Sequence, residues 1–191
     1  MLNMKRVFII HGWGGRSDKG WLKWLNKELS SKGFTVYAPD MPDKENPKIV
    51  TWVNFLKKIV GKSDENTYFV GHSIGCQAIL RYLESQEDIK LGGIVFVAGW
   101  LKIKGLESKE EEKIAAPWIN TPINLEKIRK KAKKIIAVFS DDDPFVSLEN
   151  SKIFKDKLGA KIIIEKGHGH YLEDVTKEIP VVLKELLEMA K

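Results

Sequence analysis

The sequence contains little cysteine and no long apolar segment. Its single cysteine, Cys76, excludes an internal disulfide framework. The longest apolar runs, such as residues 7–10, are far too short to span a bilayer. Residues 1–12 also lack the apolar stretch and the small-residue cleavage site of a secretory signal. Together these absences predict a cytoplasmic protein with no membrane partner.

The composition is that of an ordinary globular chain with a moderate positive charge. Of its 191 residues, 43% are hydrophobic and 30% are charged, so we expect one domain over residues 1–191. Much of the net charge of +6 lies in the basic run 126–134. No aromatic or glycine pattern of a nucleic-acid module accompanies that run, so we interpret it as a solvated helix face leading into a strand and expect no nucleic-acid partner. The acidic run 107–113 is interpreted as an exposed segment.

Short apolar segments alternate with amphipathic ones along the whole chain. The segments expected to be strands are 6–12, 34–40, 67–72, 92–100, 133–140 and 160–167. The segments expected to be helices are 20–33, 48–61, 74–86, 148–159 and 175–190, with Pro180 marking a kink or a late start in the last. Strands that are apolar throughout predict an α/β fold with a mainly parallel sheet of about six strands and helices on both faces. One long irregular stretch is expected, from Trp100 to about Ile123.

The motif Gly71-His72-Ser73-Ile74-Gly75 stands between a predicted strand and a predicted helix. This is the context of a nucleophile elbow, a turn so sharp that only glycine fits at both flanking positions. The start of the helix adds free N–H groups near the serine hydroxyl. An ordinary tight turn fits the same five residues, so the rest of the chain must decide whether Ser73 is a nucleophile.

A serine nucleophile needs a histidine base, and the base needs an acid that orients it. In this architecture the chain order is serine, acid, histidine. Residues 141–143 supply three aspartates after the fifth predicted strand, and His168 and His170 follow the sixth. Aspartates in a loop are also common turn formers, and a His-x-His pair can bind a metal. No third ligand has suitable spacing, so we expect no metal and no cofactor.

The loop after the first predicted strand, "HGWGG" at residues 11–15, exposes backbone N–H groups. Such a loop donates one hydrogen bond to the oxyanion of a tetrahedral intermediate, and the residue after the nucleophile donates the other. The predicted donors are therefore Trp13 and Ile74. A simple glycine turn is the alternative. A phosphate-binding loop of another kind also fits, but a Walker-type loop is excluded because the Gly-Lys-Ser/Thr ending is absent, and the dinucleotide fingerprint G-x-G-x-x-G does not fit.

Three longer segments resemble a known family of small α/β-hydrolases, which includes retinoblastoma-binding protein nine and the bacterial YdeN-like esterases. They are "VGHSIGCQAILRY", "PINLEKIRKKAKKIIAVFSDDDPF" and "GHYLEDVTKEIPVVLKELL". The resemblance covers nearly the whole chain. It implies the α/β-hydrolase fold without a large cap domain, a Ser-Asp-His triad and serine hydrolase activity on esters. An aminopeptidase-like action on amino-acid esters or amides is also implied by one relative.

The resemblance also selects one aspartate and one histidine. Asp143 stands directly before Pro144, as the family's acid does, and proline holds the preceding residue in an extended conformation. His170 precedes Tyr171, which matches the family's Gly-His-aromatic form. The predicted triad is therefore Ser73, Asp143 and His170, and His168 either contacts substrate or faces solvent.

These expectations combine into a serine hydrolase that cleaves a small ester, thioester or activated amide. A binding protein that kept the fold and lost turnover is the alternative, which fold alone does not exclude. A protein partner and the oligomeric state are left open. Candidate substrate contacts are His11, Trp100, Trp118, Phe145 and His168. For the three aromatic residues, core packing explains their type equally well.

Overall fold

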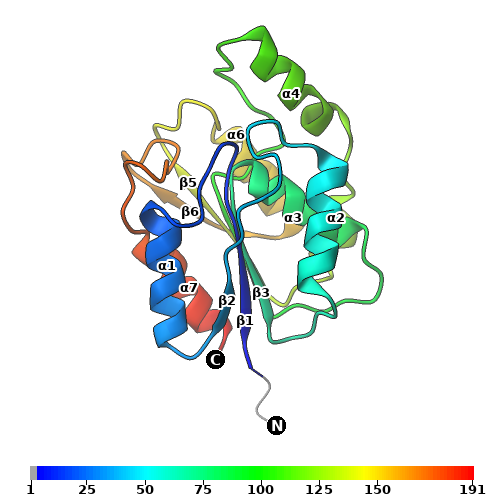
Figure 1. The fold of residues 1–191 in the computed structure, drawn as a ribbon, viewed down its shortest axis with the longest axis vertical. Helices are drawn as coiled ribbons and strands as arrows, with labels where there is room; N and C mark the ends of the chain where they lie inside the picture. Colours follow the sequence, from blue (N-terminus) through cyan, green and yellow to red (C-terminus); the bar gives the residue numbers. More distant parts are fainter. Residues whose placement is uncertain (1–3) are drawn as a thin grey trace.

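A six-stranded sheet, parallel throughout, forms the centre of the computed structural model, which describes residues 4–191. The strands lie in the order β2-β1-β3-β4-β5-β6 (Figure 1). Their bounds are β1 Arg6–Ile10, β2 Thr35–Tyr37, β3 Thr67–His72, β4 Gly93–Val97, β5 Ile135–Ser140 and β6 Lys161–Glu165. The helices are α1 Gly20–Ser31, α2 Ile49–Val60, α3 Ile74–Glu84, α4 Lys109–Asn120, α5 Leu125–Arg129, α6 Glu149–Leu158 and α7 Pro180–Met189.

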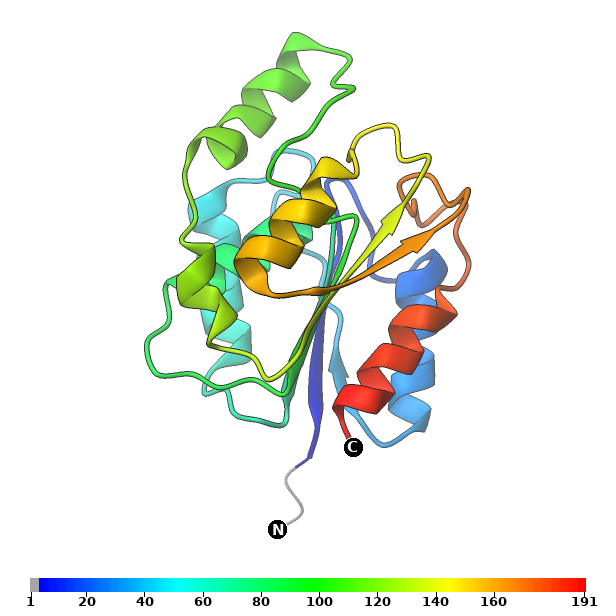
Figure 2. The same ribbon diagram turned by 180° about the vertical axis from the view of Figure 1, so that it is seen from behind.

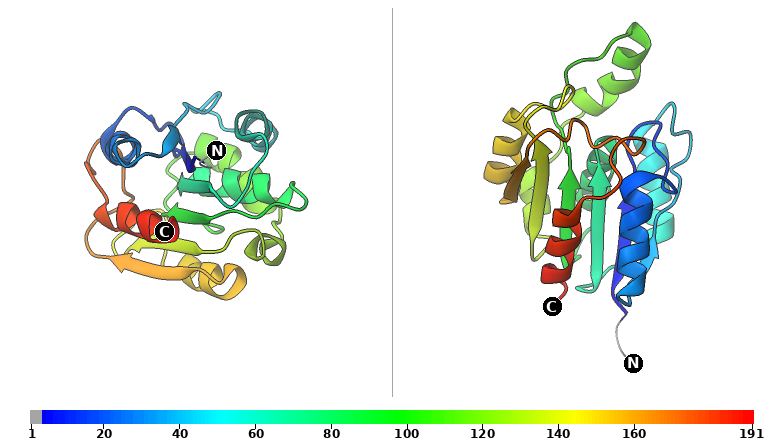
Figure 3. Two further views of the ribbon diagram at one scale, coloured as in Figure 1. Left: turned by 90° about the horizontal axis from the view of Figure 1, so that it is seen from below. Right: turned by 90° about the vertical axis from the view of Figure 1, so that its left-hand side faces the viewer.

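Helices cover both faces of the sheet, and each face has its own apolar core. Helices α1 and α7 pack on one face, while α2, α3, α5 and α6 pack on the other (Figures 2 and 3). Successive side chains of one strand point to opposite faces, so Phe69 joins the core under α2 and α3 while Val70 joins the core under α1 and α7. Phe96 and Val95 of β4 divide in the same way. The α/β prediction, with a parallel sheet of about six strands, is confirmed.

The chain changes direction across the sheet beside β1. Strand β1 pairs with β2 on one side and with β3 on the other, and β4, β5 and β6 then follow outward from β3. The loops that leave the carboxyl ends of β1 and β3 therefore run to opposite sides and open a crevice between them. The loop after β1 is residues 11–15, and β3 runs directly into Ser73.

The stretch expected to be irregular between Trp100 and Ile123 contains helix α4, which corrects that prediction. Ser108 caps α4: its hydroxyl accepts from the Glu111 N–H, and the Glu111 carboxylate accepts from the Ser108 N–H. Helix α4 projects beyond the carboxyl ends of the strands (Figures 1 and 3). The last helix starts late, with Pro180 in its first turn, rather than kinking. Among residues 4–191, no helix has the length and apolar character to cross a membrane.

Candidate active site

Ser73 occupies a strained turn between β3 and α3. Its φ of 50° and ψ of −120° lie in a region that residues with a side chain rarely adopt. A Cβ on Gly71 would come within 2.9 Å of the Cys76 backbone, and a Cβ on Gly75 within 2.5 Å of the carbonyl oxygens of Ile10 and His11. The two glycines are therefore required for close packing of the turn against β1 and α3.

A chain of two hydrogen bonds joins Ser73 to residues that follow β5 and β6. The Ser73 Oγ lies 2.9 Å from His170 Nε2, and His170 Nδ1 lies 2.8 Å from Asp143 Oδ2. The other carboxylate oxygen of Asp143 accepts from the N–H groups of Phe145 and Val146 at 2.8 and 2.9 Å. Because a carboxylate only accepts, His170 carries its proton on Nδ1, and its Nε2 lone pair faces the serine hydroxyl.

The surroundings of His170 favour its neutral form. Burial lowers the pKa of His170 below the ordinary value of 6.5, although the hydrogen bond from its ring to Asp143 opposes this shift. A neutral imidazole at physiological pH can accept a proton from a serine hydroxyl. Cys76, one helical turn after Ser73, is fully buried, and its burial raises the pKa of the thiol, so it is not a competing nucleophile.

His11 fixes the loop that faces Ser73. Its Nε2 accepts from the Met41 N–H at 2.7 Å, so Nδ1 carries the proton and donates to the Gly12 carbonyl, also at 2.7 Å. In a trans peptide the C=O and the following N–H point in opposite directions, so this bond turns the Trp13 N–H away from His11. His11 is fully buried, and burial lowers its pKa, so its bonding pattern persists at neutral pH.

A cavity of about 280 Å³ opens over Ser73 and His170. Five apolar side chains form most of its wall: Trp13, Ile103, Leu106, Phe145 and Leu172. The wall also contains three carboxylate side chains, Glu45, Glu111 and Glu173, and none of its residues is lysine or arginine. The shape and lining suit a small, largely apolar molecule whose reacting atom sits at Ser73.

Residues 101–113, which we call the roof segment, cover one side of this cavity. The segment includes the start of helix α4, and this helix is fixed at its far end, where the buried Arg81 donates to the carbonyls of Trp118 and Thr121, each at 2.8 Å. The Trp118 indole N–H donates to the Pro47 carbonyl at 2.9 Å. The roof segment is thus anchored at both ends, through α4 at one end and at the other by the buried Asn150, whose Oδ1 accepts from the N–H groups of Leu101 and Lys102.

Known proteins are similar to this chain in both fold and sequence. Residues 7–184 match the family described as serine hydrolase. The chain belongs to the serine hydrolase family.

Two similar proteins are described as hydrolases. The chain is 34% identical to the putative hydrolase YdeN of Bacillus subtilis (strain 168) over 172 residues, which cover 89% of this chain and 87% of YdeN. It is 29% identical to the serine hydrolase RBBP9 of Rattus norvegicus over the full length of both. The crystal structure of the YdeN gene product superposes with a TM-score of 0.88 at 32% identity, covering 97% of this chain and 98% of the other. The resemblance seen in the sequence is therefore confirmed.

The structure of this serine hydrolase brings some predicted site residues together and separates others. Phe145 lines the cavity and meets the His170 ring edge-on, with 5.2 Å between ring centroids. Trp100 and Trp118 do not line the cavity. Both side chains are buried in the apolar core on the α2 and α3 side of the sheet, where they pack against other core residues. His11 is likewise buried behind the loop rather than in the cavity wall. His168 is exposed and stacks on Tyr171, away from the cavity.

The first two aspartates of the 141–143 run have roles that sequence reasoning missed. Asp141 accepts from the Gly167 N–H at 3.0 Å, and Asp142 accepts from the Gly169 N–H at 2.8 Å. The Ser140 hydroxyl donates to Asp142 and accepts from the His168 N–H. All three aspartates therefore hold the loop that carries His170. The sequence indicated that the aspartates and the histidine loop lie close together, because they follow neighbouring strands. Which aspartate binds which group of that loop depends on the loop backbone.

Among residues 4–191, no group of three or more histidine, cysteine, aspartate or glutamate side chains is arranged to hold a metal ion. His11 and His170 use both ring nitrogens in the hydrogen bonds described above. The chemistry available at this site is that of a serine hydroxyl beside an oriented imidazole.

Proposed function

We propose that this serine hydrolase cleaves a small ester, thioester or activated amide through an acyl-enzyme intermediate on Ser73. The observation that carries the proposal is the hydrogen-bonded chain Ser73–His170–Asp143, with distances of 2.9 and 2.8 Å. Nucleophile, base and orienting acid lie within hydrogen-bonding reach of one another and open onto a cavity, which is the arrangement that acyl transfer requires.

In the proposed reaction, the Ser73 Oγ attacks the substrate carbonyl carbon while His170 Nε2 takes the hydroxyl proton. His170 then gives this proton to the leaving alkoxide, thiolate or amine, and the acyl group stays on Ser73 as an ester. Water attacks that ester with His170 again as base, which releases a carboxylic acid and restores the serine. Asp143 keeps the imidazole in the required tautomer throughout.

The proposed oxyanion donors are the N–H groups of Trp13 and Ile74. Ile74 begins α3, where the first N–H groups of a helix have no acceptor within the helix. The hydrogen bond from His11 to Gly12 supports the role of Trp13, because it sets the plane of the Gly12–Trp13 peptide. Two backbone donors aimed at one oxygen stabilise the negative charge of the tetrahedral intermediate.

The carboxylates of the cavity wall favour neutral or cationic substrates over acidic ones. Glu45 and Glu111 place negative charge around the space above Ser73, and the cavity wall contains no lysine or arginine that would balance it. This observation keeps an amino-acid ester or amide as the second candidate substrate class. Paired assays of glycine ethyl ester and monoethyl succinate, which differ in the sign of their charge, discriminate the classes.

An active-site-directed fluorophosphonate tests the central proposal. We expect the wild-type protein to be labelled at Ser73, as located by mass spectrometry of its peptides, and Ser73→Ala to remain unlabelled. Failure of a folded wild-type sample to react would favour the alternative of a binding protein without turnover. A cytoplasmic location and a single-domain organisation remain predictions from the sequence.

A further inference from the structure

His72 is a buried histidine that the reaction steps above leave unused. It ends β3, directly before Ser73, and only 2% of its surface is exposed. Its Nε2 lies 2.8 Å from the backbone carbonyl oxygen of His170. A carbonyl oxygen only accepts, so His72 must carry a proton on Nε2. His72 therefore binds the main chain of the residue whose side chain faces Ser73.

The second ring nitrogen of His72 faces a carboxylate. His72 Nδ1 lies 3.5 Å from Glu173 Oε1. Within residues 4–191, neither atom has another hydrogen-bond partner, and both are buried. If His72 were neutral, its one ring proton would be on Nε2 and the lone pair of Nδ1 would face the Glu173 carboxylate. Two buried hydrogen-bond acceptors would then face each other with no donor between them, which is unfavourable. A proton on Nδ1 converts this repulsion into an ion pair.

The groups around the pair leave it no other partner. Burial by itself would raise the pKa of Glu173, but the contact with His72 and a backbone hydrogen bond hold this pKa below the ordinary value of 4.5, so Glu173 is a carboxylate. The His72 ring lies 5.2 Å from the His170 ring and 5.7 Å from the Trp21 ring between centroids, and the charge of Glu173 also acts on His11, whose two nitrogens are already occupied. None of them offers Glu173 or His72 Nδ1 an alternative partner.

We propose that His72 is an imidazolium paired with Glu173, and that this pair positions the main chain of His170. A charged donor makes a shorter and stronger hydrogen bond than a neutral one, so the pair holds the His170 carbonyl firmly. His170 is then fixed at two points: Asp143 orients its ring and His72 holds its backbone. The inference rests on the proposed function for the role of His170 as base, but the charge state of His72 can be measured without any activity.

Nitrogen NMR of the ¹⁵N-histidine-labelled wild-type protein measures that charge state. The His72 ring is assigned through bonds to its own backbone, so no variant is needed. At pH 7.5 we expect both ring nitrogens of His72 to be protonated, whereas His11 shows one protonated nitrogen. A neutral His72 ring under these conditions would overturn the proposal, whatever the activity of the protein.

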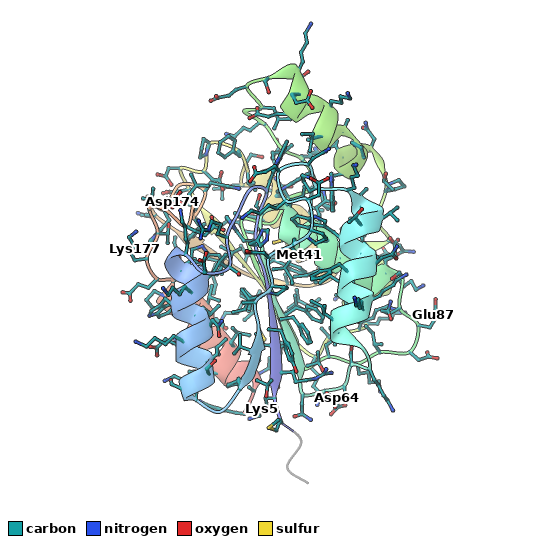
Figure 4. All side chains as sticks on the ribbon, in the orientation of Figure 1. Lys5, Met41, Asp64, Glu87, Asp174 and Lys177 are labelled. Carbon is teal, nitrogen blue, oxygen red and sulfur yellow. The ribbon has the colours of Figure 1, made fainter. Side chains whose placement is uncertain are left out.

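Glu173→Gln tests the positioning role by removing one charge with little change of shape. Asp174→Asn is the matched control, because it removes the same charge from the next residue, which is at the surface above α1 and pairs with Lys19 (Figure 4). In Glu173→Gln we expect His72 to become neutral and kcat on an aryl ester to fall roughly ten-fold, with KM within about two-fold, because the base is slightly misplaced. The control should match the wild type. Unchanged kcat in Glu173→Gln, or an equal loss in the control, would contradict the role.

Discussion

The floor and the roof of the cavity are built in different ways. The floor consists of Ser73, Asp143, His170 and the loop 11–15, which stand at the carboxyl ends of buried parallel strands and are linked by short hydrogen bonds. The roof segment is partly exposed and contacts the loop just after Asp143 through a backbone bond from Lys104 N–H to the Phe145 carbonyl at 2.9 Å. The difference teaches that the ends of the buried strands fix the distances among Ser73, His170 and Asp143, while the roof segment only forms part of the cavity wall.

The largest expected effect comes from removing the base in the floor. His170→Ala leaves Ser73 without a proton acceptor, so we expect kcat for ester hydrolysis to fall on the order of 10⁶-fold, as when one member of a triad is lost. The matched control is His168→Ala, two residues away in the same loop, whose ring is exposed and stacked on Tyr171. Steady-state assays should give the control at least about a tenth of wild-type activity. The reverse pattern, in variants with native circular dichroism, would assign the base to His168.

The next effect concerns the acid. In Asp143→Asn the amide N–H₂ can donate to His170 Nδ1, which moves the ring proton to Nε2, where it can no longer accept from Ser73. We expect kcat to fall about 10⁴-fold with KM little changed. Asp142→Asn is the control, because its amide oxygen can still accept from the Gly169 N–H and the Ser140 hydroxyl. A silent Asp143→Asn beside a damaging Asp142→Asn would move the acid to Asp142.

The floor could be predicted from the sequence because its chemistry coincides with strong local signals. Glycines flank Ser73 where a strand pattern turns into a helix pattern, and the aspartates and histidines follow later strands. The residue pattern by itself left three aspartates and two histidines as candidates, and the resemblance selected Asp143 and His170; the remaining contacts of these loops could not be predicted. Whether an oxygen of Asp142 meets Gly169 or His170 depends on loop backbone angles, and the contact of His72 with Glu173 joins residues about a hundred positions apart in the chain.

The roof was harder to predict because its residues follow no strand. Helix α4 lies in a charged segment with only two buried side chains, Ala115 and Trp118, so its apolar periodicity is weak. The capping signature of Ser108 and Glu111 was present, but it stood in a run of acidic residues that resembled a solvated loop. The placement of Trp100 and Trp118 in the core likewise follows from packing, which residue type alone does not specify.

A third prediction uses the pH dependence of the rate to test whether burial controls the pKa of His170. In the proposed mechanism the neutral form of His170 is the base, and burial lowers the pKa of His170, so kcat/KM should rise with pH to a plateau with a midpoint below 6.5. Below that midpoint the rate should fall about ten-fold per pH unit. The free energy of unfolding should also decrease as pH falls below about 6.5, because the unfolded chain then binds protons that buried His11 and His170 resist. A midpoint clearly above 6.5 would mean that the hydrogen bond to Asp143, which raises the pKa of His170, outweighs burial.

The smallest expected effect lies in the roof and asks whether it takes part in the reaction. Ser108→Ala removes the cap of α4, which costs about 1 kcal/mol of local helix stability and loosens the neighbouring Leu106 and Glu111. These side chains line the cavity without touching Ser73 or His170, so we expect KM for a short aryl ester to rise a few-fold and kcat to stay within about two-fold. Ser108→Asp should restore the wild-type KM, since aspartate is an equally good cap and its charge suits a helix N-terminus. A hundred-fold loss of kcat in Ser108→Ala that Ser108→Asp restores would place the roof segment in the reaction itself, and the distinction between floor and roof would fail.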